Sequence, residues 1–242
     1  MKKLLFLVMI GAVAASAFAE EDELVSERHW TPVQLNLASP LGLPWADRDV
    51  YGLRMNVFYG HSVELAGIDV GIAGATRGSV YGLQMNLFNQ VEGFFRGVQF
   101  GPIANYDVKN AYGLQVAGIL NWCLDDCVGV QFGMFNLSGG YTGAQFGLLN
   151  WESGSVCGLS LGFVNAAQTD FEGCALGVAN FCKGNLRGCQ FGVFNMVSGH
   201  SEGLQFGVFN ASEDHTGVQI GLLSINCNGA LPIMAIFNAN FR

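Results

Sequence analysis

Apolar and polar side chains alternate within an eight-residue phrase that recurs along most of the chain. It reads GLQFGVFN at 203–210, GCQFGVFN at 188–195 and GVQFGMFN at 129–136. Successive side chains of a β-strand point to opposite faces, so this alternation predicts a strand. In the first copy, one face would carry Leu204, Phe206, Val208 and Asn210, and the other would carry Gly203, Gln205, Gly207 and Phe209.

Twelve copies of the phrase align by their leading glycine, and seven of the eleven steps between them have the length of the step from Gly188 to Gly203. Two steps are longer by one and two are shorter by one, and the difference falls between the phrases, in clusters of turn-favouring residues such as VSGH and SEDH. A catalytic motif is needed once, so this repetition indicates architecture, with one strand and one turn in each repeat. The leading glycines are Gly52, Gly67, Gly82, Gly97, Gly113, Gly129, Gly143, Gly158, Gly173, Gly188, Gly203 and Gly217.

Two residue types keep fixed places in the repeat. Glutamine stands in the middle of the second face at 84, 99, 115, 131, 145, 190, 205 and 219. Asparagine ends the first face at 89, 136, 150, 165, 180, 195 and 210. Glutamines in such a column would either line a lumen or satisfy neighbouring polar groups, and the repetition favours the structural role.

Two folds can be built from these units. In an antiparallel meander Phe194 lies opposite Gly173, and large residues cover glycines on the next strand. In a parallel solenoid glutamine stacks on glutamine and asparagine on asparagine. A strand that spans the whole phrase leaves too short a segment for a regular second side on the way to the next rung. This count favours the meander, since hairpin turns fit the interval.

The two ends of the chain also favour the meander. Residues 33–37 and 231–241 resemble further strands, which raises the total to an even number of about 14. The terminal Asn240-Phe241-Arg242 resembles the closing strand of an outer-membrane barrel, and a closed barrel has no exposed edge strands. We therefore expect an all-β, repeat-built antiparallel meander that closes into a barrel of about 14 strands, with a parallel β-solenoid as the alternative.

The first residues have the pattern of a secretory signal peptide. Lys2 and Lys3 precede an apolar run, and Ala17-Phe18-Ala19 forms a small-x-small cleavage site. We expect a signal peptide at 1–19, a short acidic segment at 20–32 and a single all-β repeat domain at 33–242. The leader contains no cysteine, so a lipoprotein anchor has no candidate residue.

Composition and charge limit the classes of function. The formal net charge is −8, and removal of the two leader lysines makes it −10, so a nucleic-acid partner is not expected. The chain has 34 glycines and only 12% charged residues, which is unusual for a soluble enzyme and suits a sheet that tolerates apolar groups on both faces.

Seven cysteines in an exported chain leave at least one unpaired. The most plausible bridge joins Cys123 to Cys127, whose C-x3-C spacing is a weak metal signal. Cys174 and Cys189 distinguish the two folds, because parallel rungs would stack them whereas the meander separates them and predicts no bridge. His29, His61, His200 and His215 are scattered, and we expect solvated histidines rather than metal ligands.

No catalytic motif is present. The chain lacks G-x-S-x-G, H-E-x-x-H and a P-loop, and its carboxylates lie mostly in the variable turns. We therefore expect no enzyme activity, no catalytic residues, no cofactor and no metal site, and the sequence identifies no small-molecule ligand.

The phrases GLQFGVFN, GAQFGLLN and GVQIGLLS, with the opening TPVQLNL and the ending LPIMAIFNANF, resemble a bacterial surface-repeat family of exported proteins over about residues 30–242. This resemblance implies a location at the cell envelope and no particular activity. A looser similarity to curli-type amyloid subunits rests on the Q-x-G-x-x-N pattern at 205–210, although period and apolar content differ.

Together these patterns predict an exported structural β-barrel of the outer membrane or cell surface, with a narrow pore as an option and no catalysis. Its partners would be outer-membrane lipid and the barrel-assembly machinery. The alternative is a surface-exposed β-solenoid that acts as an adhesin or as a fibre-forming subunit.

Overall fold

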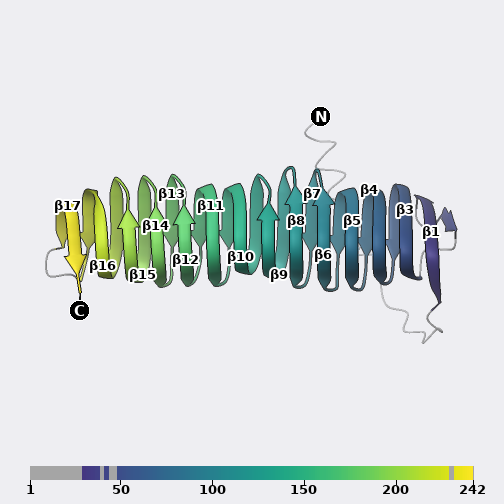
Figure 1. Cartoon of the computed structure of the whole chain (residues 1–242), viewed down its shortest axis with the longest axis horizontal. Helices are drawn as coiled ribbons and strands as arrows, with labels where there is room; N and C mark the ends of the chain where they lie inside the picture. The colour runs from purple at the N-terminus through teal and green to yellow at the C-terminus, as the bar shows by residue number, and fades with distance from the viewer. Residues whose placement is uncertain (1–28, 39–40, 44–47, 229–231, 242) are drawn as a thin grey trace.

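The computed structural model describes residues 29–38, 41–43, 48–228 and 232–241, and in this part of the chain all elements are β-strands. They stack into a long parallel β-solenoid, which Figure 1 shows from the side. The expected antiparallel barrel is therefore wrong, and the solenoid alternative describes the fold. No helix long and apolar enough to cross a membrane occurs in the described residues.

The strands follow one another along the chain with short corners between them. They are β1 (Trp30–Ala38), β2 (Leu41–Leu43), β3 (Asp49–Ser62), β4 (Leu65–Thr76), β5 (Val80–Val91), β6 (Phe95–Gly101), β7 (Ala104–Asp107), β8 (Ala111–Ala117), β9 (Leu120–Phe132), β10 (Phe135–Glu152), β11 (Val156–Ala167), β12 (Phe171–Leu176), β13 (Ala179–Cys182), β14 (Leu186–Phe191), β15 (Phe194–Phe206), β16 (Phe209–Asn226) and β17 (Ile233–Asn240).

Each repeat forms one complete rung, and equivalent residues of consecutive rungs pair in register. Between β14 and β15, Gly188 pairs with Gly203 and Gln190 with Gln205. On the other side of the rung, Asn195 of β15 pairs with Asn210 of β16. Glutamine therefore stacks on glutamine and asparagine on asparagine, as the parallel scheme requires.

From the sequence we expected too few residues for the return to the next rung. This expectation is wrong, because the phrase is not one strand. In the copy at 203–210 the chain bends at Gly207, between the end of β15 at Phe206 and the start of β16 at Phe209. We call this bend and its equivalents the glycine corner. A Cβ atom on Gly207 would clash with the carbonyl oxygen of Gly192 in the rung below, so only glycine fits here. The bend divides the phrase between the two sides of the rung, which leaves enough residues for the return.

The leading glycine of each repeat, which we call the column glycine, has a backbone that other residues rarely adopt. Gly203 has φ of 131°, and the other eleven column glycines have similar positive values. A Cβ atom on Gly203 would clash with the Gly188 carbonyl oxygen, so the close stacking of rungs also excludes a side chain here.

The variation in repeat length is absorbed at two different corners of the rung. The two longer steps, which end at Gly113 and Gly129, carry one extra residue at the glycine corner, where Pro102 and Gly118 are placed. The two shorter steps lose one residue at the opposite corner, at 138–140 and at 212–214, and the register with the preceding rung shifts there. The in-register columns are preserved in both cases.

The two ends of the solenoid are covered by strands of opposite direction. β17 pairs antiparallel with β16, and β2 pairs antiparallel with β1. Figure 1 places β1 and β17 at opposite ends of the molecule, so the first and last strands do not meet as a barrel would require. Phe241 is exposed beyond β17, and Arg242, the predicted signal peptide and most of the acidic segment lie outside the described residues.

Candidate functional site: an apolar shell over a polar interior

The side chains that point into the solenoid form four stacked columns. Two columns consist mainly of glutamine and asparagine, and a third is mostly apolar, with members such as Val80 and Phe171 in the buried core. The fourth is mixed, because apolar members such as Val197 alternate with buried polar ones such as Thr76 and Ser138. In the described rungs the glutamines line no lumen, because their side chains are fully buried and bond to one another. The structural role predicted for the glutamines is confirmed.

The glutamine column is a series of hydrogen bonds between amides. Gln99 donates to Gln84 Oε1 at 3.0 Å, and Gln145 donates to Gln131 Oε1 at 2.9 Å. The series stops after Gln145, because Ser160 and Ala175 occupy the next two places, and it resumes with the donation from Gln205 to Gln190. At the gap, Gln145 Oε1 and Ser160 Oγ are buried without a hydrogen-bond partner.

The asparagine column is continuous from Asn89 to Asn210. Asn195 Nδ2 donates one proton to Asn210 Oδ1 at 2.8 Å and the other to the Phe206 carbonyl at 3.0 Å. That carbonyl immediately precedes the glycine corner, so the asparagine fixes both the rung spacing and the bend. Asn105 and Asn121 also belong to this column, and sequence alignment at a constant offset missed them because their rungs carry the extra corner residue.

The first rungs replace the amides with a buried ion pair. Arg54 and Asp69 occupy the places that glutamine holds elsewhere, and both side chains are fully buried. The guanidinium donates to both carboxylate oxygens, at 2.8 Å through Nε and 2.6 Å through Nη2. Asn56 and Asn86 also donate to Asp69, at 2.7 and 2.8 Å. Arg54 and Asp69 each stand two residues after a column glycine, as the column glutamines do. This position was the signal in the sequence that would have placed both side chains inside.

Two further carboxyl groups lie inside the middle rungs. Burial raises the pKa of Asp107 to about 7, and donated hydrogen bonds from Gln99 and Gln115 partly oppose this. Burial raises the pKa of Glu152 to about 8. Asp107 and Glu152 each stand two residues after a column asparagine. Since both are buried, as Asp69 is, the expectation that acidic residues lie in the outer turns is wrong for these three.

His215 is also an interior residue and not a solvated one. Its Nδ1 lies 3.1 Å from Ser201 Oγ, and burial lowers its pKa to about 4. The imidazole is therefore neutral near pH 7.

The outer surface of the solenoid is apolar around the glycine corner and on both sheets, except at the position directly before the column glycine, where Arg187 and Glu202 are exposed. In the rung that begins at Gly203, the outward side chains are those of Leu204, Phe206, Val208, Phe209 and Ala211. We call these five positions, with their equivalents in the other rungs, the apolar shell. Among the rungs between Gly52 and Ile225 the shell contains no Asp, Glu, Lys or Arg.

The shell includes rows of large side chains whose rings align between rungs. Phe194 and Phe209 stack with centroids 5.3 Å apart, and Phe132 and Phe146 stack at 4.7 Å. Phe206 remains 50% exposed and Phe163 59%. The expected alternation was right for Leu204 and Phe206, but the bend at Gly207 turns Asn210 inward, so the polar residues fill the interior and the apolar residues face outward.

Exposed charges gather at the corner opposite the glycine corner, which we call the polar corner. Arg77, Lys109, Asp170, Lys183 and Glu213 are examples. The segment at 212–214 belongs to this corner, but the Ser212 side chain points inward and accepts a hydrogen bond from Gln219 at 3.1 Å. The solenoid is thus amphipathic in cross-section.

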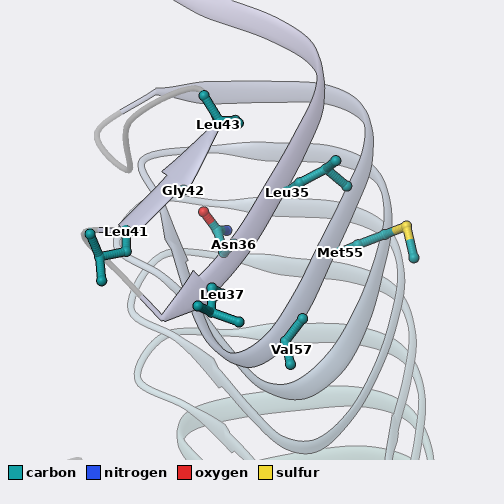
Figure 2. A pocket seen from close by; sticks show the side chains of 8 residues that line it. All are labelled: Leu35, Asn36, Leu37, Leu41, Gly42, Leu43, Met55 and Val57. Atoms are coloured by element: carbon teal, nitrogen blue, oxygen red, sulfur yellow. The ribbon is translucent and has the colours of Figure 1, made fainter.

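An apolar groove lies at the first end of the solenoid. Figure 2 shows Leu35 and Leu37 of β1, Leu41 and Leu43 of β2, and Met55 of β3 around it. Leu43 is 76% exposed, and Asn36 at the base donates to Asn56 at 2.9 Å. The groove extends the apolar shell as far as β2, the strand that covers this end of the solenoid.

The cysteines do not lie as expected. Cys123 and Cys127 are both free and buried, on two different interior columns, so the structure does not contain the bridge that the sequence favoured. Cys174 and Cys189 are paired in register with their sulfur atoms 2.6 Å apart, contrary to the separation expected in a meander. Among the described residues, no cluster of three or more histidine, cysteine or acidic side chains is arranged to hold a metal ion.

Comparisons with known proteins complete the description of the site. No protein-family model, curated protein or solved structure matches the chain. Function therefore has to be inferred from the residues and their arrangement.

Proposed function

We propose that this protein is an exported, non-catalytic β-solenoid of the cell surface that acts as an adhesin, binding another apolar surface through its apolar shell. The observation that carries this proposal is the inversion of the usual pattern: amides fill the interior while Phe, Leu, Met and Val side chains cover the outside. Contiguous apolar patches on monomeric soluble proteins rarely exceed a few hundred Å², and larger ones mark interaction sites. The leader-like first residues and the repeat resemblance support export.

The interior supports this role by making the shell rigid. Because the asparagine column links the rungs from Asn89 to Asn210 and the glutamine column reinforces it on both sides of the gap, the outward rings are held at the rung spacing of about 4.8 Å. Burial of one exposed phenylalanine against an apolar partner contributes about 1.5–3 kcal/mol. A few neighbouring rungs therefore suffice for firm attachment, without a deep pocket.

The test measures binding of the mature chain to an octyl-coated surface and to bare silica in a flow cell. The wild type should prefer the octyl surface, and Phe206→Glu/Phe209→Glu should reduce its affinity at least roughly 10-fold. Ser153→Glu/Ser198→Glu adds the same two charges at exposed polar-corner positions and should bind as the wild type does. Equal binding by all three proteins would overturn the proposal.

The location is tested separately by protease treatment of intact cells. A surface protein should be digested without cell lysis, and a periplasmic control protein should survive. Protection of the chain in intact cells would contradict surface exposure.

A fibre-forming subunit is the second candidate, favoured by apolar side chains on the terminal strand. Ile233, Ile236 and Phe237 of β17 are 65%, 71% and 51% exposed. If they join molecules end to end, the wild type should form filaments visible by electron microscopy, and Ile236→Lys should remain monomeric. Monomeric wild type at high concentration would exclude this candidate.

A further inference from the structure

Two cysteines face outward at the same place in consecutive rungs. Cys174 lies on β12 and Cys189 on β14, each directly after a column glycine, and the two residues are paired in register. Their sulfur atoms are 2.6 Å apart, and both side chains are partly exposed. In-register parallel neighbours have Cα atoms about 4.8 Å apart, within the range that a disulfide spans.

The pair lies beside the gap in the glutamine column. Cys174 precedes Ala175 and Cys189 precedes Gln190, so the cysteines stand next to an interior step that has no glutamine pair. The steps from 145 to 160, 160 to 175 and 175 to 190 all lack a glutamine–glutamine bond, whereas the asparagine column continues there, with Asn180 donating to Asn195 at 2.9 Å. One of the two amide links between rungs is therefore missing.

We propose that Cys174 and Cys189 form a disulfide that joins two consecutive rungs where the glutamine column is interrupted. The two thiols lose two protons and two electrons as the S–S bond forms, and a disulfide oxidant such as oxidised glutathione accepts them and becomes two thiols. The reaction requires an oxidising compartment, which the proposed export would supply.

The other cysteines lack this geometry. Cys157 is exposed, but its in-register neighbours are Thr142 and Glu172. The buried Cys123 thiol donates to the Lys109 carbonyl at 3.3 Å, and the Cys127 thiol donates to Gln115 Oε1 at 3.4 Å. Only Cys174 and Cys189, among the described cysteines, face each other across a register pair.

The test is peptide mapping of the full mature chain under non-reducing conditions. The protein is oxidised with glutathione disulfide, its free thiols are alkylated, and it is cut with trypsin and Glu-specific protease. Cleavage after Glu172, Lys183, Arg187 and Glu202 places Cys174 and Cys189 on separate peptides, 173–183 and 188–202. We expect these two peptides to be recovered as one linked species, with fragmentation assigning the link to Cys174 and not to Cys182.

A stability measurement tests what the link does. The oxidised protein should have a thermal midpoint roughly 5–10 °C above that of the reduced protein, because the bond closes a loop of one full repeat. Cys174→Ser/Cys189→Ser should give one midpoint in both redox states, whereas Cys157→Ser should keep the difference. Recovery of both cysteines in alkylated form would overturn the proposal, as would a linked protein whose midpoint does not change.

This experiment is independent of the adhesive role. Loss of octyl-surface binding in the shell variants leaves the peptide map unchanged, and failure of the disulfide leaves the binding assay unchanged.

Discussion

The first and middle rungs of the solenoid bury carboxyl groups in two different ways. Asp69 in the first rungs is paired with the Arg54 guanidinium and accepts further bonds from Asn56 and Asn86. Asp107 in the middle rungs is equally buried, but its partners are the neutral amides of Gln99 and Gln115. An interior of constant width thus accommodates an acid either as an ion pair or as a carboxyl group whose pKa burial raises to about 7.

The largest expected effect of this difference is on the pH dependence of the middle rungs. Asp107 and Glu152 have folded pKa values of about 7 and about 8, above the ordinary values near 4, so the folded state binds more protons. Their contribution to the free energy of unfolding is full below pH 4 and falls until the pH exceeds 8, by about 4 kcal/mol for each group. Urea unfolding followed by tryptophan fluorescence measures this, because Trp122 packs on Tyr106 and Trp151 precedes Glu152.

The control for this prediction is Asp107→Asn/Glu152→Gln, which should flatten the dependence between pH 5 and 8.5. His215 acts in the opposite direction, because its lowered pKa removes stability as the pH falls from 6.5 to about 4. An equal slope in the wild type and the double variant would show that these two carboxyl groups are not the source.

The next largest effect is expected from breaking the ion pair of the first rungs. Arg54→Met leaves the buried Asp69 carboxylate without a cation and should cost about 3–5 kcal/mol. Hydrogen exchange of peptides within 50–91 should rise, while exchange within 186–226 stays unchanged. Arg54→Gln/Asp69→Gln, which extends the glutamine column into these rungs, should recover most of the protection. A double variant as unstable as Arg54→Met would show that the volume of arginine matters more than its charge.

A smaller effect is expected where the glutamine column is interrupted. Ala175 shares the interior with Phe171 and Cys182, so Ala175→Gln should overpack that rung and cost about 1–3 kcal/mol, measured by urea unfolding. Ala211→Gln places the same side chain on the outward face and should change stability by less than about 0.5 kcal/mol. A stabilising Ala175→Gln would mean that the interior there has room for the amide.

The smallest effect is expected at the surface pair Arg187–Glu202, whose side chains are 72% and 53% exposed. Arg187→Ala/Glu202→Ala should change the free energy of unfolding by less than about 0.5 kcal/mol, because solvent screens exposed ion pairs. Comparison of this double variant with Arg54→Met shows whether the loss of unfolding free energy comes from burial of the charge or from the loss of an ion pair as such. A cost as large as that of Arg54→Met would contradict this explanation.

The sequence predicted the repeat, its β-structure and the fixed places of its amides, but not the bend that divides each phrase between two strands, nor the parallel direction of those strands. The alternation around Leu204 and Phe206 is the same in a hairpin and in a rung, and only the corner at Gly207 distinguishes them. That corner depends on close contact with Gly192 in the rung below, a contact that no local pattern records. The buried acids were missed for a related reason, since Asp107 and Glu152 follow the asparagine by two residues in a part of the repeat whose sequence varies.

The preservation of register through repeats of unequal length has a consequence for how such a protein changes over generations. A duplicated repeat adds one complete rung, with its own column glycine, amides and outward side chains, and the neighbours on both sides meet the surfaces they already fit. The molecule then grows by about 4.8 Å for each copied unit. The length of the solenoid can thus change by gain or loss of whole repeats in the gene. The strands β2 and β17 would continue to pair with β1 and β16 at the two ends.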